Sequence, residues 1–190
     1  MEDNIIELKQ GEVLLHTNDE IKCLYLILSG ETDIYSRYGR ISTSAGSILG
    51  LSGSLYGLSL YNYVAKSDCT LRKFTVSGIS DLEKILREYP DMVPDIVILN
   101  EHFIMELIKL YLSMMIKCKR KDPSFTPDSR LNKWVLDKHN GIASIPEDIK
   151  KAYFGANISN SAGIIIENTE FINLLHELVE DIIPRQLLDG

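Results

Sequence analysis

The chain has 190 residues, of which 45% are hydrophobic and 25% are charged. This length and balance are typical of one soluble globular domain or two small ones, and they exclude a disordered or fibrous chain. Lys and Arg number 20 against 27 Asp and Glu, so the formal net charge is -7. The protein has no overall basic field to hold a polyanion, and any nucleic-acid contact must come from a local patch.

The sequence carries no sign of a membrane or secretory segment. No apolar run approaches the roughly 20 residues that cross a bilayer, and Met1–Asn4 lacks the basic start of a signal peptide. We therefore expect a cytoplasmic protein with no membrane partner. Its three cysteines, Cys23, Cys69 and Cys118, form no C-x-x-C pair. We expect them to be reduced and mostly buried thiols.

The first 75 residues consist of short β-rich runs separated by Gly and Ser. The runs are Glu12–Leu15, Cys23–Ser29, Thr32–Ser36, Tyr61–Ala65 and Cys69–Thr75. Strands of this length and spacing predict an antiparallel sandwich or barrel. The unbroken apolar run Leu24–Leu28 predicts a strand that is covered on both faces, whereas the alternation in Thr32–Tyr35 predicts a half-exposed strand.

From about Asp91 the apolar spacing changes from two residues to alternating steps of four and three. This spacing predicts one long helix with an apolar stripe along it. The stripe consists of Val93, Val97, Asn100, Ile104, Leu107, Tyr111, Met114 and Cys118, and a second stripe of Ile96, Leu99, Phe103 and Leu110 lies on another face.

Two apolar stripes on one helix suggest that one packs on the chain's own barrel and the other on a second copy of the chain. We expect a homodimer whose interface contains Val97, Asn100, Ile104, Leu107, Tyr111 and Met114. Asn100 in the seam would favour one register. The alternative is a monomer that buries both stripes under its C-terminal segment.

A basic and proline-containing segment follows the long helix. Lys117–Pro123 breaks the helix, and we interpret Lys117–Pro127 as a hinge. Beyond it, helix-like spacing predicts a compact helical domain from three segments, Ser129–His139, Ile145–Phe154 and Ile158–Asp181. The expected division is 1–90 for the β-barrel, 91–121 for the long helix and hinge, and 122–190 for the helical domain.

Several motifs carry a resemblance to a known family. Gly11–Leu15, Leu24–Glu31 and Gly46–Gly50 resemble, in their usual order, the signatures of the cyclic-nucleotide-binding barrel of the CRP/FNR family of bacterial transcription regulators. Arg130–Leu136 is similar to the helix that opens the family's winged helix-turn-helix. Ile149–Ala152 with Gly155, followed by Ile158–Ser161, resembles the helix-turn-helix core less closely.

The resemblance implies an α+β fold with three parts. These are an N-terminal antiparallel β jelly-roll barrel, a long dimerisation helix, and a C-terminal helical, winged-helix-like domain. It also implies a transcription regulator that binds DNA through this last domain.

The effector pocket that the resemblance implies lacks its charged residues. Nucleotide-binding members of the family supply a Glu for the ribose and an Arg for the cyclic phosphate. Here Leu51 occupies the Glu position and the Arg position falls near Ser59, with no charged residue between Ile41 and Ala65. Because a desolvated phosphate needs a charge-assisted partner, we do not expect cyclic AMP or cyclic GMP to bind in the usual manner.

The same segment offers hydroxyl, aromatic and aliphatic side chains instead. The candidate pocket residues are Leu49, Gly50, Leu51, Ser52, Ser59, Tyr61 and Tyr63. Such a lining suits a neutral or weakly polar effector of unknown identity. The alternative is that these side chains fill the pocket and the protein needs no ligand.

The C-terminal segment also departs from the family pattern. A recognition helix carries Arg, Lys, Gln or Asn to base edges. Between Ala152 and Pro184 there is no Lys or Arg, and there are five carboxylates. The candidate DNA contacts are Lys119, Arg120, Lys121, Lys150, Lys151, Ser159, Asn160 and Ser161. DNA is therefore a candidate partner only through weak, salt-sensitive binding. The alternative is that these lysines only keep a hinge and a helix face in contact with solvent.

The sequence offers no catalytic constellation. The four histidines are isolated, which argues against a cupin-like metal site, and no G-x-S-x-G elbow is present. We expect no enzyme activity, no cofactor and no metal. Two hypotheses remain: a homodimeric CRP/FNR-like regulator with a degenerate effector pocket that contacts DNA, and a dimeric sensor or adaptor of the same fold that binds protein or a neutral small ligand and not DNA.

Overall fold

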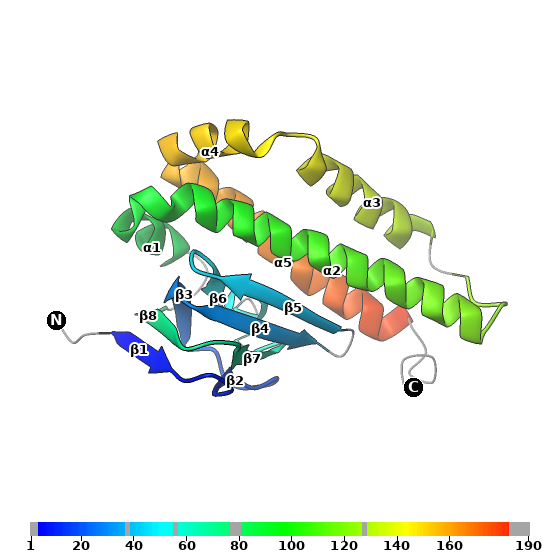
Figure 1. Ribbon diagram of the computed structural model, residues 1–190. Helices are drawn as coiled ribbons and strands as arrows, with labels where there is room; N and C mark the ends of the chain where they lie inside the picture. Colours follow the sequence, from blue (N-terminus) through cyan, green and yellow to red (C-terminus); the bar gives the residue numbers. More distant parts are fainter. Residues whose placement is uncertain (1–3, 37–38, 55–56, 77–80, 127–128, 183–190) are drawn as a thin grey trace.

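The computed structural model describes residues 4–36, 39–54, 57–76, 81–126 and 129–182. Two four-stranded antiparallel sheets face each other and lie under a layer of helices (Figure 1). The first sheet has the order β1 (Ile5–Leu8), β8 (Cys69–Thr75), β3 (Cys23–Ser29) and β6 (Ile48–Leu49). The second has the order β2 (Val13–Leu15), β7 (Asn62–Ala65), β4 (Glu31–Ser36) and β5 (Gly39–Ser44).

The five predicted strands are all present, as β2, β3, β4, β7 and β8. The sequence pattern missed β1, β5 and β6. β6 has only two residues, and β5 is polar at four of its six positions. These strands owe their existence to pairing with neighbours, since β5 is paired along its whole length with β4. The expected jelly-roll-like pair of antiparallel sheets is confirmed.

The two contrasting strand predictions had different outcomes. In β3 the side chains of Leu24, Leu26 and Ile27 are fully buried, as the unbroken apolar run predicts. In β4 the predicted half-exposed alternation is wrong, because Thr32, Asp33 and Ile34 are all buried. The Asp33 carboxylate accepts hydrogen bonds from Ser42 Oγ at 2.6 Å and from Arg40 at 3.3 Å, which makes its burial tolerable.

A short 3-10 helix, η1 (Leu51–Gly53), lies between β6 and β7. All the elements described after β8 are helices, namely α1 (Leu82–Glu88), η3 (Pro90–Met92), α2 (Val93–Lys121), α3 (Ser129–Ala143), α4 (Glu147–Ala156) and α5 (Ile158–Ile182). The long helix and the three later helices are confirmed. The predicted hinge begins too early, because α2 continues through Lys121 and ends before Pro123. Three basic residues of the expected hinge, Lys119, Arg120 and Lys121, thus lie in the last turn of α2, where cations interact favourably with the helix dipole.

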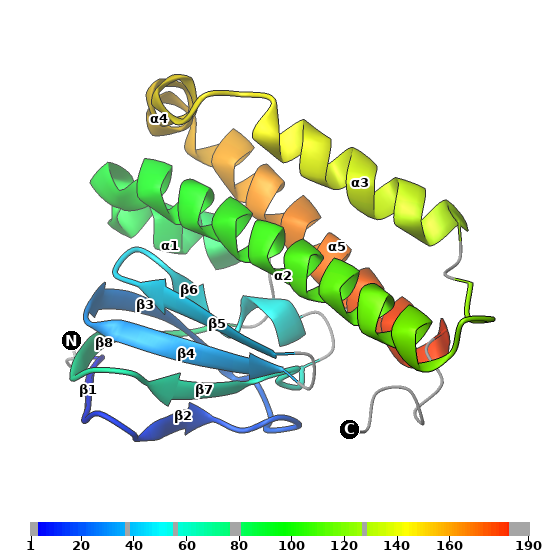
Figure 2. The ribbon, with the colours of Figure 1, turned by 45° about the vertical axis from the view of Figure 1, so that its right-hand side comes forward.

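The helices form one layer rather than a separate C-terminal domain. α5 runs beside α2 in the same direction, and α3 returns above them in the opposite direction (Figures 1 and 2). α2 contacts α3, α4, α5 and strand β5, and α5 also contacts α1 and η1. Within the described residues after β8, no strand is present to serve as the wing of a winged helix. None of the described helices has the length and apolar content that a bilayer-spanning segment needs.

The predicted dimer stripe of α2 is covered by the chain itself. Five of its six residues are buried, namely Val97, Ile104, Leu107, Tyr111 and Met114. They share core clusters with α5 residues such as Ile165, Phe171 and Leu175. Asn100 in the middle of the stripe accepts a hydrogen bond from Asn168 Nδ2 of α5 at 2.8 Å. The stripe is therefore no open surface for a second copy, and α5 occupies the place expected for the partner.

The second stripe of α2 packs on the barrel, as expected. Leu99 and Phe103 contribute to a cavity whose other walls come from the sheets. At the turns of the β-barrel, Gly46 lies close beneath Leu99, and Gly39 lies close beneath Leu110. Both glycines have positive φ angles. This close approach holds α2 directly on the open face of the barrel.

Candidate functional site

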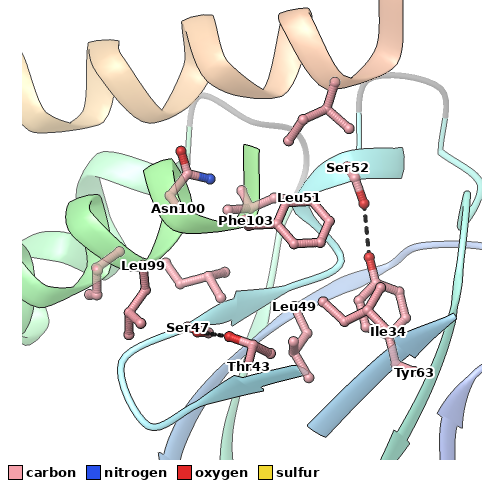
Figure 3. A pocket seen from close by; sticks show the side chains of 13 residues that line it. Ile34, Thr43, Ser47, Leu49, Leu51, Ser52, Tyr63, Leu99, Asn100 and Phe103 are labelled. Atoms are coloured by element: carbon pink, nitrogen blue, oxygen red, sulfur yellow. Dashed lines mark hydrogen bonds between the residues drawn. The ribbon is translucent and has the colours of Figure 1, made fainter. Parts of the chain in front are cut away.

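The candidate site is a small cavity between the β-barrel and the helices that cover it (Figure 3). Its volume is about 40 Å³, enough for about three water molecules. The lining consists of Ile34, Thr43, Ser47, Ile48, Leu49, Leu51, Ser52, Tyr63, Ile96, Leu99, Asn100, Phe103 and Ile172. The barrel provides the floor, and α2 and α5 provide the roof.

Two glycines set the path of the chain from β6 into η1. Gly50 has a φ of 90°, a left-handed conformation that directs the following residues into the barrel. At Gly53, a Cβ atom would lie only 1.9 Å from the carbonyl oxygen of Leu58. Glycine is therefore required at position 53, and this tight turn places Leu51 and Ser52 in the cavity wall.

The hydroxyl groups of Ser52 and Tyr63 form a hydrogen bond with each other across the cavity (Figure 3). Their oxygen atoms are 2.9 Å apart, and both side chains are buried. Burial raises the pKa of Tyr63 to about 12, although hydrogen bonds from Ser52 and from the Gly50 backbone act in the opposite direction. The phenol is therefore neutral at physiological pH, and both hydroxyls are already engaged within the protein.

The structure brings four of the seven predicted pocket residues into the cavity wall, namely Leu49, Leu51, Ser52 and Tyr63. The other three lie beside it. Gly50 forms the entry turn, and the buried Ser59 donates a hydrogen bond to the carbonyl of Tyr61 at 2.7 Å. Tyr61 packs edge-on against Phe103 of α2 and His176 of α5.

The sequence prediction missed the helical roof of the cavity. Ile96, Leu99, Asn100 and Phe103 come from α2, and Ile172 comes from α5. The second apolar stripe of α2 was the available signal, because its residues had to pack on the barrel. Nothing in the local sequence of α5 showed that Ile172 would also reach the cavity.

The electrostatics of the cavity disfavour an anion. None of the residues that line it, all in the described part of the chain, carries a charge. A phosphate placed there would lose its hydration without gaining a cation, which costs several kcal/mol. The cavity is suited to apolar packing and to a few waters.

The residues predicted to contact DNA are mostly engaged within the chain. Lys150 is buried, with Nζ 2.5 Å from Glu101 and 2.7 Å from the carbonyl of Ile142. Lys151 lies 3.3 Å from Asp95. Ser159 donates a hydrogen bond to Glu83.

The remaining members of the predicted DNA set divide between the two ends of the helix layer. Ser161 is fully buried and bonds to the carbonyls of Phe154 and Asn157, while the side chain of Asn160 lines a cavity among the helices. Lys119 donates to the carbonyl of Phe125 at the far end of α2, where Arg120 and Lys121 are exposed. α4 and the C-terminal end of α2 lie at opposite ends of the layer (Figure 1). The structure thus does not bring the predicted DNA contacts together into one surface.

Comparison with known proteins supports the assignment of the β-barrel. Residues 5–87 match the family model described as the cyclic nucleotide-binding domain. The match confirms the expected barrel type and ends before α2. No curated protein matches the chain.

Solved structures similar to this chain include three from different organisms. A regulatory subunit of a cAMP-independent protein kinase A from Trypanosoma brucei is 22% identical with a TM-score of 0.36, over 37% of this chain and 27% of that one. A cyclic nucleotide-binding-like protein from Brucella abortus is 22% identical with a TM-score of 0.32, over 37% and 66%. The N-terminal domain of a transcriptional regulator from Streptomyces coelicolor is 23% identical with a TM-score of 0.33, over 46% and 64%.

Proposed function

We propose that this chain is a sensor or interaction module built on a cyclic nucleotide-binding fold that takes up no cyclic nucleotide. The observation that carries the proposal is the uncharged cavity of about 40 Å³ beneath α2 and α5. Its hydroxyl groups are paired with each other, and it has no cation for a phosphate. The module acts on a partner through its surface, and it performs no chemistry of its own.

The packing of the helices supports the same proposal. In a module that senses a ligand in the β-barrel, the ligand must reach the barrel from outside. Here Phe103 and Ile172 line the cavity on its helical side, and Ile172 is buried. Because the cavity measures only about 40 Å³, a nucleotide would need α2 or α5 to move, at the cost of the apolar area that they bury.

Isothermal titration calorimetry with four nucleotides and nucleosides tests the proposal. We expect no binding of cyclic AMP, cyclic GMP, adenosine or guanosine at millimolar concentration. Uptake of a nucleoside alone would refute the volume argument and leave the charge argument intact. Tighter binding of a cyclic nucleotide than of its nucleoside would refute the charge argument, because the two differ chiefly by the phosphate.

A second candidate function is a CRP/FNR-like transcription regulator with a degenerate effector pocket and weak DNA contact. The specific observation in its favour is the exposed basic end of α2, which contains Lys117, Lys119, Arg120 and Lys121. A helix terminus of this charge can contact phosphates without reading bases. The acidic character of α5 and the internal engagement of Lys150 weigh against specific recognition.

A gel-shift titration at low and moderate salt separates the two functions. The interaction module predicts no discrete complex with random or promoter DNA above about 0.1 M salt, because a few phosphate contacts are lost as salt rises. If a complex persists there, the regulator is favoured. In that case Arg120→Glu should abolish it, whereas the control Lys22→Glu, an equal charge change at an exposed lysine on the barrel, should leave it unchanged.

A further inference from the structure

A second and larger cavity lies within the helix layer, apart from the barrel. It is lined by residues of α2, α3, α4 and α5 and by Ile145 between α3 and α4, and it has a volume of about 560 Å³. That volume falls within the range of about 300 to 1,000 Å³ that is usual for small-molecule sites. The cavity is separate from the candidate site described above, and the two share no lining residue.

The wall of this helical cavity is mainly apolar. Ile142, Phe154 and Ile164 lie within it, and Ile145 and Ile149 stand at its solvent-exposed edge. Ile145 is 49% exposed and Ile149 is 56% exposed. These large aliphatic side chains are exposed to water beside a concave apolar wall. Covering them with an apolar group would lower the free energy.

Both lysines in the wall are engaged by groups of the protein. Lys150 forms the buried ion pair with Glu101 and also donates to the carbonyl of Ile142. Lys138 lies 2.9 Å from Glu167 and stands over the ring of Phe171. Neither ammonium group is therefore available to neutralise an anionic ligand.

One carboxylate in the wall has no such partner. Asp137 is exposed on α3, and within the described part of the chain it forms no ion pair. The wall contains three carboxylates, Glu101, Asp137 and Glu167, against the two lysines. The surplus negative charge lies at the edge of an apolar cavity, where a cation would be attracted and an anion repelled.

From this geometry we infer that the helical cavity binds an amphipathic organic cation, an apolar chain or ring that carries one protonated amine. The apolar body lies among the isoleucines and Phe154, and the ammonium group lies at Asp137. The inference rests on the cavity and its charges alone, and it does not depend on the proposed function of the barrel.

Three probes with the same tail and different head groups test this inference. Octylamine is protonated at pH 7, octanol is neutral and octanoate is anionic. The full chain is titrated with each probe below its micellar concentration. Octylamine should bind about tenfold tighter than octanoate, with octanol between them. The reason is that the electrostatic interaction of an exposed carboxylate with a unit charge on the head group corresponds to an affinity change of this order. No binding of any probe, or octanoate binding as tightly as octylamine, would overturn the inference.

A substitution in the wall shows whether binding takes place in this cavity. Gly141 belongs to the cavity wall, and a Cβ atom at this position would meet no atom within 4 Å. Gly141→Leu therefore places a bulky side chain at the wall from an unobstructed Cβ position and also removes a helical glycine. We expect it to weaken octylamine binding at least tenfold. Gly163→Leu on α5 is the matched control, since position 163 is equally open and lies outside the wall. Equal affinity in the two variants would refute the location.

Two single variants, each of which removes one carboxylate charge, test the role of Asp137. Asp137→Asn should reduce the preference for octylamine over octanol to near unity and leave octanol binding unchanged. Asp148→Asn, at an exposed position on α4 outside the wall, is the control and should keep the wild-type preference. A preference that survives Asp137→Asn would contradict the assignment of the ammonium position.

Discussion

At the scale of single residues, a few side chains decide what the barrel can hold. Leu51 and Ser59, which the sequence resemblance places at the two charged positions of a nucleotide site, carry no charge. Ser52 and Tyr63 bond to each other inside the cavity instead of pointing to a ligand. Both features support the proposal that the barrel takes up no cyclic nucleotide.

The buried phenol of Tyr63 predicts a specific dependence of stability on pH. In the unfolded chain the phenol ionises near pH 10, whereas in the folded chain its pKa is about 12. Between these values the unfolded state holds fewer protons than the folded state, so the free energy of unfolding falls as pH rises. The full loss from this one group is on the order of 3 kcal/mol.

The variant Tyr63→Phe should lack this part of the alkaline decline. Urea unfolding of both proteins at pH 8, 10 and 11 measures it, and the other tyrosines are common to both. At pH 8 the variant should be less stable by about 1 kcal/mol, because the buried Ser52 hydroxyl loses its partner. Adding Ser52→Ala should recover part of that loss. Parallel pH profiles for wild type and Tyr63→Phe would show that Tyr63 does not titrate as described.

At the scale of elements, sequence periodicity predicts which faces are buried but not what buries them. The alternating spacing in α2 predicted both the helix and its apolar stripe, and both are present. The same spacing is compatible with packing on a second chain and with packing on α5, because either partner offers an apolar surface. Only the long-range packing of α5 distinguishes the two, and no local pattern carries that information.

The same limit applies to the strands and to the candidate site. β3 and β8 were predicted with their observed bounds because their apolar character is local. β5 and β6 were missed because pairing with neighbouring strands creates them. Part of the barrel side of the cavity was predicted from residues near one loop, but Ile34, Thr43, Ser47 and Ile48 were missed. The α2 and α5 side depends on long-range contacts, which for Ile172 span more than 100 positions.

The hydrogen bond between Asn100 and Asn168 provides a test of the α2–α5 contact. Asn100→Leu removes the acceptor from the side-chain amide of Asn168, whose residue is 2% exposed. The free energy of unfolding should fall by about 1 to 3 kcal/mol, as measured by urea unfolding. The double variant Asn100→Leu with Asn168→Leu should regain much of this loss, because no polar group is left unpaired.

Sedimentation of the same variants distinguishes internal packing from dimerisation. If α5 covers the stripe, Asn100→Leu leaves the sedimentation coefficient unchanged over a wide range of protein concentration. If the stripe instead meets a second copy, leucine in the seam should strengthen the association. A rise in sedimentation coefficient with concentration would therefore favour the homodimer predicted from the sequence.

At the scale of the whole molecule, the helix layer is tied together by an ion pair of low exposure. Glu101 on α2 and Lys150 on α4 belong to helices far apart in the sequence, and their side chains are 10% and 7% exposed. Replacing one partner leaves a buried charge without compensation, which typically costs about 3 to 5 kcal/mol. The pair therefore makes the position of α4 sensitive to either residue.

We expect Lys150→Met to lower the free energy of unfolding by about 3 kcal/mol or more. The double variant Glu101→Leu with Lys150→Met should be close to wild type, since an apolar pair of similar volume needs no solvation. Thermal unfolding followed by circular dichroism measures both. As a control, Lys151→Met breaks the exposed pair with Asp95 and should change stability by less than about 1 kcal/mol. Equal effects of Lys150→Met and Lys151→Met would argue against the buried ion pair.

The cover that α5 provides for α2 has a consequence during synthesis. Translation completes α2 at Lys121 and reaches α5 only at Ile158, after α3 and α4. At about 5 to 20 residues per second, the apolar stripe of α2 leaves the ribosome seconds before the segment that will bury it. Throughout that interval the nascent chain presents a long hydrophobic ridge, which makes it a natural client for a chaperone that holds emerging polypeptides.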